Sequence, residues 1–116
     1  MTTTHTNPAL TWYRSHGGYV NREGFGFLLC WEGRYVWQAP ESTVIEIKAK
    51  NCAEAKRIIT SIVKSISVHH GSQWRGYCLS CGAALRSWDN AQDMAMAIIR
   101  HLRSAPTAHP QFIRYN

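Results

Sequence analysis

The chain has 116 residues, of which 45% are hydrophobic and 17% are charged, a composition typical of one globular domain and not of a disordered chain. We expect residues 1–9 to form a flexible N-terminal lead and residues 10–116 to fold as a single α+β domain. Thirteen Lys and Arg against seven Asp and Glu give a net charge of +6, which favours an anionic partner, either nucleic acid or an acidic protein surface.

The first half of the chain predicts five strands separated by short turns, in segments 10–14, 19–20, 25–31, 34–38 and 44–50. Glu32-Gly33 lies between two of them and predicts a tight hairpin turn, because glycine supplies a positive φ. In the fifth segment the isoleucines alternate with polar residues, so Lys48 and Lys50 are expected on the outward face.

Asn51 to Ser67 predicts an amphipathic helix. Asn51 is the expected N-cap, and Glu54 three residues later completes a capping-box pattern. Apolar residues then recur every three or four positions and predict a buried face made of Ile58, Ile59, Ile62 and Ile66. Lys56 and Arg57 fall on the opposite, solvated face.

The second half of the chain predicts a hairpin, a second helix and a short terminal strand. The hairpin strands are residues 73–79 and 83–88, and the helix begins at Asp89 or Asn90 and ends at Arg103. The expected fold is an α+β arrangement with one antiparallel sheet of five or six strands, in the order βββ(β)α-ββα, and two helices packed on one face.

Residues 77–85 (YCLSCGAAL) resemble the first knuckle of a zinc ribbon, in the form C-x-x-C-G-x-x-L. Two thiolates two residues apart on a tight turn can reach one tetrahedral ion, so the resemblance implies Cys78 and Cys81 as zinc ligands. It covers nine residues, and the second C-x-x-C of a ribbon is absent from this chain. The alternative is that no cofactor binds and both thiols are small buried hydrophobes.

The remaining zinc ligands would have to come from elsewhere in the chain. His69 or His70 is the expected third ligand, ahead of Cys52 or Cys30, although the adjacent histidines could instead form a solvated helix cap. Histidines after Cys81 do not fit the spacing of a zinc finger.

Basic and aromatic residues predict two binding surfaces. The first is a positive patch of Lys48, Lys50, Lys56 and Arg57, suited to a phosphate backbone. The second combines an arginine with aromatic rings that can stack on bases or anchor a protein partner, and consists of Trp74, Arg75 and Tyr77. The alternative is that these rings fill the core.

The expected function is non-enzymatic binding, to nucleic acid or to a complex that handles nucleic acid. One alternative is an inhibitor or accessory factor of a phage or mobile element that binds a protein, of the anti-CRISPR or anti-restriction type, and another is a structural zinc-binding module. No catalytic residues are expected, because the seven carboxylates are scattered and phosphate-loop, Rossmann and metalloprotease motifs are absent. A Cys–His activity built from distant residues is the enzymatic alternative.

With no secretory signal and no apolar run long enough for a membrane span, we expect a cytoplasmic protein with reduced thiols and no membrane partner.

Overall fold

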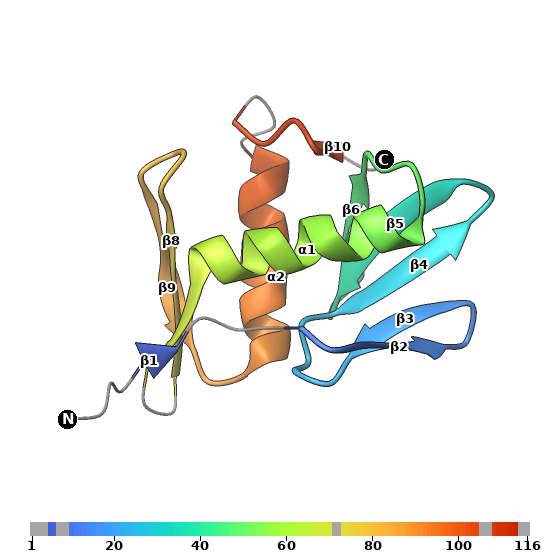
Figure 1. Ribbon diagram of the computed structural model, residues 1–116. Coiled ribbons are helices and arrows are strands. Elements are labelled where there is room, and N and C mark those ends of the chain that lie inside the picture. The colour runs from blue at the N-terminus through green and yellow to red at the C-terminus, as the bar shows by residue number, and fades with distance from the viewer. Residues whose placement is uncertain (1–4, 7–9, 71–72, 105–107, 114–116) are drawn as a thin grey trace.

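The computed structural model describes residues 5–6, 10–70, 73–104 and 108–113 (Figure 1). Within these ranges two helices and ten strands follow one another as β1 (His5–Thr6), β2 (Trp12–Ser15), β3 (Gly18–Asn21), β4 (Phe27–Trp31), β5 (Arg34–Ala39), β6 (Thr43–Ile47), α1 (Cys52–Ile66), β7 (Ser67–His70), β8 (Gln73–Cys78), β9 (Ala83–Trp88), α2 (Ala91–Ser104) and β10 (Phe112–Ile113).

The strands form two antiparallel sheets. The larger has six strands in the order β10-β6-β5-β4-β3-β2, and the second has the order β1-β7-β8-β9. The predicted α+β class, with antiparallel strands and two helices, is confirmed. The hairpin of β8 and β9 belongs to the second sheet, which also takes up residues 5–6 of the predicted N-terminal lead.

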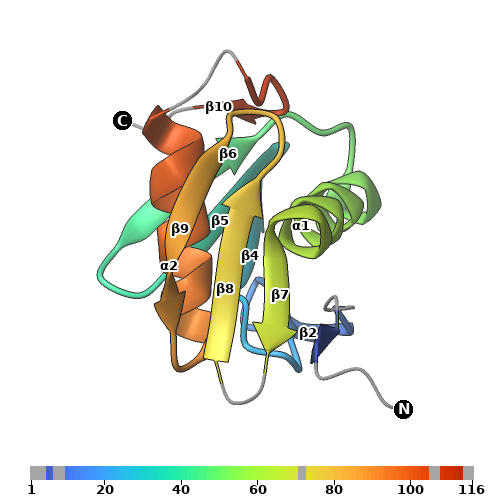
Figure 2. The same ribbon diagram turned by 90° about the vertical axis from the view of Figure 1, so that its left-hand side faces the viewer.

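Each helix contacts strands of both sheets: α2 stands between them, and α1 crosses in front of α2 from β7 toward the large sheet (Figure 1). In Figure 2 the strands β7, β8 and β9 face the viewer, with α1 on one side, α2 on the other and β4 to β6 behind. This arrangement brings the C-terminal end of α2, the tip of the β8–β9 hairpin and the segment before β10 to the same end of the molecule.

Local sequence explains the turns and helix starts. Glu32 and Gly33 have φ values of 50° and 75°, which is the pattern of the predicted two-residue hairpin turn. The side chain of Asn51 accepts a hydrogen bond from the Glu54 N–H at 2.8 Å, and the Glu54 carboxylate accepts one from the Lys50 N–H. The predicted cap of α1 is therefore confirmed.

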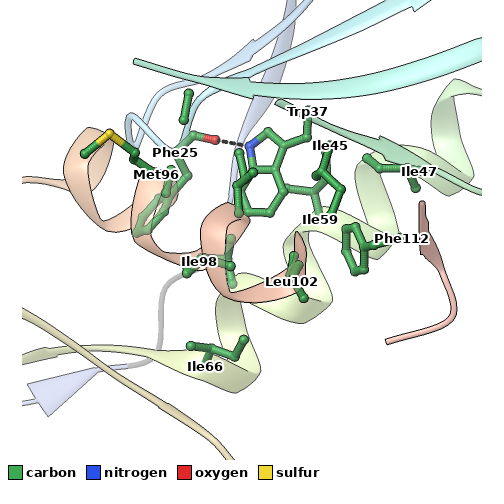
Figure 3. Close-up of a cluster of buried hydrophobic side chains, with 14 of the residues drawn as sticks. Phe25, Trp37, Ile45, Ile47, Ile59, Ile66, Met96, Ile98, Leu102 and Phe112 are labelled. Atoms are coloured by element: carbon green, nitrogen blue, oxygen red, sulfur yellow. Dashed lines mark hydrogen bonds between the residues drawn. The ribbon is translucent and has the colours of Figure 1, made fainter. Parts of the chain in front are cut away.

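Side chains from both helices and the large sheet fill one core (Figure 3). Trp37 is fully buried at its centre, and its indole N–H donates to the Phe25 carbonyl at 2.9 Å, so no polar atom of the ring is left unpaired. The buried face of α1 consists of Ala55, Ile59, Val63 and Ile66. The expectation of full burial was wrong for Ile58 and Ile62, which are only partly covered.

Candidate metal centre

Four donor side chains converge at the tip of the β8–β9 hairpin. One ligand atom from each of Cys78, Cys81, His101 and His109 lies within 4.8 Å of every other. No carboxylate belongs to the group. In structural sites Zn²⁺ is commonly bound by two thiolates and two imidazoles.

Three separate parts of the chain position these donors. Cys78 is the last residue of β8, and Cys81 lies in the turn that follows, where the Gly82 N–H donates to the Cys78 carbonyl at 2.7 Å. Gly82 has a φ of 72°, a conformation that glycine adopts without strain. His101 lies in the last turn of α2.

His109 comes from the segment that leads into β10. Its carbonyl accepts a hydrogen bond from the Phe112 N–H at 3.1 Å, and Phe112 is buried in the core. The side chain of His109 is buried as well, with 4% of its surface exposed. The core therefore holds this segment in place beside the hairpin.

The distances between donor atoms fit one tetrahedral ion. The two Sγ atoms are 3.6 Å apart, and the Nε2 of His109 lies 3.4 Å from the Sγ of Cys78 and 3.3 Å from that of Cys81. Metal–sulfur bonds of about 2.3 Å and metal–nitrogen bonds of about 2.0–2.1 Å give tetrahedral sulfur–sulfur and sulfur–nitrogen distances of about 3.8 and 3.5 Å. The three observed separations lie within about 0.2 Å of these values.

The burial and protonation state of the two imidazoles suit them to bind a metal. Nε2 of His101 is buried and has no hydrogen-bond partner among the described residues, which is costly unless another group satisfies it. Burial lowers the pKa of His101, and burial together with the neighbouring His101 lowers the pKa of His109. Both rings are therefore neutral at neutral pH, which is the form that binds metals.

The Cys81 thiol stays protonated until a metal binds. Desolvation, followed by the hydrogen bond and charge of Cys78, raises the pKa of the Cys81 thiol. A divalent ion reverses this preference, because it displaces the thiol protons as it binds. Two thiolates and two neutral imidazoles would give a zinc site with no net charge. Protein atoms would then fill all four tetrahedral positions and leave none for a reactive water.

Two of the four donors in the cluster, Cys78 and Cys81, are residues that the sequence also singled out. Cys78 and Cys81 are brought together as expected, but β7 pairs with β8 so that His69 lies opposite Trp74 and His70 opposite Gln73. Trp74 is four residues from Cys78, or about 13 Å along the strand. The register therefore keeps the backbone of both histidines away from the thiols.

His101 and His109 were set aside on their spacing, but the structure places a ring nitrogen of each within 4.8 Å of both thiols. They follow Cys81 by 20 and 28 residues, because α2 lies between the hairpin and both of them. A weak signal was present in the sequence: His101 lies three residues after Ile98, which places it beside the buried stripe of α2. A polar residue at such a position needs a partner.

The four cations of the predicted basic patch have different surroundings in the structure. Lys48 and Lys50 are exposed but lie beyond the end of β6, and Arg57 pairs with the Glu54 carboxylate at 3.4 Å. The ammonium of Lys56 lies 4.0 Å from the centre of the Tyr19 ring.

Two of the three residues of the second predicted surface are exposed in the structure. Arg75 and Tyr77 are exposed on the same face of β8, and Leu79 in the following turn is 82% exposed. Trp74 points the other way and packs edge-on against Phe25, with ring centres 4.9 Å apart. Trp74 is therefore partly buried and packed against the core.

Comparisons of the chain with family models, with curated proteins and with solved structures found no match. Among the described residues, neither helix has the length and hydrophobicity needed to cross a membrane.

Proposed function

We propose that this protein is a small non-enzymatic binding protein whose β8–β9 hairpin is held in place by a structural Zn²⁺. The observation that carries the proposal is the convergence of Cys78, Cys81, His101 and His109 within 4.8 Å, with separations among Cys78, Cys81 and His109 that match a tetrahedral ion. The closed set of four protein ligands favours a structural over a catalytic role.

The metal content of the purified protein tests this proposal. Protein expressed in zinc-containing medium and purified without chelator is expected to carry about one zinc ion per chain. Replacing one ligand, as in Cys81→Ser or His101→Ala, is expected to weaken zinc binding by more than about 100-fold, since even the loss of a supporting hydrogen bond costs 10- to 100-fold.

Cys52→Ser is the matched control, because it removes a half-buried thiol that lies outside the cluster. Its zinc content is expected to equal that of the wild type. Less than about a tenth of a zinc per chain in the wild type, with unchanged stability in chelator, would contradict the proposal.

A second proposal concerns the partner, which we infer to be nucleic acid. It is supported by the net charge of +6 and by the exposed Arg75 and Tyr77 on one face of β8, next to the candidate zinc site. A tyrosine ring can stack on a base while the guanidinium contacts a phosphate. Among the described residues, no ion pair with a carboxylate competes for Arg75.

Fluorescence anisotropy with labelled single strands and duplexes at several salt concentrations tests this second proposal. Tyr77→Ala is expected to cost about 1–3 kcal/mol of binding free energy, and Arg75→Ala to reduce the salt slope by about one unit. Lys64→Ala, an exposed cation on α1, is the control. No binding at low salt would overturn the proposal. Loss of a protein complex on replacing Trp31, which is 69% exposed on β4, would assign the partner to the protein class instead.

A further inference from the structure

A second pair of thiols lies far from the candidate zinc site in the chain. The Sγ atoms of Cys30 and Cys52 are 2.8 Å apart, which is closer than the 3.6 Å between Cys78 and Cys81. Both are free thiols, and both are half-buried. A disulfide has a sulfur–sulfur distance of about 2.05 Å, so a movement of about 0.8 Å would join them.

This pair belongs to two elements that are distant in sequence. Cys30 lies on β4 of the large sheet, and Cys52 is the first residue of α1. The hairpin of β4 and β5, strand β6 and the connection to α1 separate them. A bond between the two sulfurs would therefore tie the N-terminal end of α1 to the sheet.

The two thiols share the wall of one surface pocket. The pocket has a volume of about 300 Å³, and its other lining residues are Arg14, Gly17, Gly18 and Tyr19. Small molecules can enter a space of this size. A reagent in solution therefore has a route to both sulfurs.

The surroundings give the two thiols different roles. Burial raises the pKa of the Cys30 thiol to about 12, with a further contribution from its hydrogen bond with Cys52, so this thiol keeps its proton at neutral pH. Cys52 lies at the start of α1, where the free N–H groups of the first turn favour negative charge. Arg14 lines the same pocket as Cys52, and the pKa of its guanidinium is raised mainly by Tyr19, with a smaller contribution from the charge of Cys52.

We propose that Cys30 and Cys52 are a reversible disulfide site, oxidised by exchange with a small-molecule disulfide of the type of oxidised glutathione. The thiolate of Cys52 attacks one sulfur of the small disulfide, forms a mixed disulfide and releases one small thiolate, which takes up a proton. Cys30 then loses its proton and attacks the sulfur of Cys52, which releases the second small thiol. Two protein thiols are oxidised to one disulfide, and the small disulfide is reduced to two thiols.

Peptide mapping of zinc-loaded, full-length protein tests the site. The protein is incubated with oxidised glutathione, free thiols are alkylated in acid-quenched samples, and the linked peptides are identified by mass spectrometry. We expect a Cys30–Cys52 linkage that reduced glutathione reverses, and a melting temperature raised by about 5–10 °C in the oxidised protein. A linkage of Cys78 with Cys81 alone, or full alkylation of Cys30 and Cys52, would overturn the proposal.

Single variants test the order of attack. Cys30→Ser is expected to stop at the mixed disulfide and retain one glutathione on Cys52, whereas Cys52→Ser is expected to form neither product. Arg14→Ala is expected to slow the first step about two- to fivefold, the effect of one exposed charge pair, and Lys64→Ala to leave it unchanged. Melting curves of each reduced variant establish that it is folded. A folded Cys30→Ser variant that traps no glutathione would also contradict the proposal.

Discussion

At the scale of single residues, two glycines with the same backbone conformation show how packing adds to conformational strain. Gly26 and Gly33 have φ values of 74° and 75°. A Cβ atom on Gly33 would meet nothing within 4 Å, but one on Gly26 would lie 2.5 Å from the Gln38 carbonyl oxygen and 2.7 Å from the Trp37 indole nitrogen. Gly26 is therefore required by the close approach of two strands as well as by its φ.

We expect Gly33→Ala to lower the free energy of unfolding by about 1–2 kcal/mol, the cost of a left-handed conformation with a side chain. Gly26→Ala is expected to cost about 1–3 kcal/mol more, because backbone and indole atoms must move. Urea denaturation of both variants measures the difference. Equal losses of unfolding free energy would show that Gly26 is required only for its positive φ.

At the scale of elements, the spacing of apolar residues predicted the helices and most strands. An alternating or a helical spacing indicates which face of an element is buried. Asn51 and Asn90 cap α1 and α2 as their positions suggested, each accepting a hydrogen bond from the N–H three residues later. Strand β7 was missed because Ser67 follows α1 without a break and the strand is only four residues long. Its pairing is decided by β8, which local sequence does not reveal.

The buried face of α1 gives a test at the same scale. Ile59→Ala is expected to cost about 2–5 kcal/mol of unfolding free energy, since the side chain is fully buried. Ile62→Ala is expected to cost less, because this residue lies at the edge of the core. Chemical denaturation of both variants measures the ranking. A larger loss at Ile62 would contradict the burial of α1.

At the scale of the whole molecule, the candidate zinc site depends on how distant segments meet. The C-x-x-C pair was visible in the sequence because both thiols lie on one local turn. The two histidines were not, because β9, α2 and the packing of Phe112 bring them to that turn. Only the assembled fold therefore defines the complete donor set.

Because zinc would bind the folded chain and join three segments, its removal should destabilise the whole protein. At a free zinc concentration of 100 times the Kd, binding stabilises the fold by about 2.7 kcal/mol, which corresponds to about 10 °C in melting temperature. We expect chelator to lower the melting temperature of the wild type by about this amount. Cys81→Ser is expected to melt at the same temperature with and without chelator, and a chelator effect of equal size in this variant would place the metal elsewhere.

X-ray absorption at the zinc edge, on the purified protein, tests the central claim most directly. We expect two sulfur neighbours at about 2.3 Å and two nitrogen neighbours at about 2.0–2.1 Å, with no other ligand in a four-coordinate shell. His109→Ala should lose one nitrogen neighbour or the metal itself. A shell of oxygen atoms, or a zinc ion with fewer than two sulfur neighbours, would contradict a structural site built from Cys78, Cys81, His101 and His109.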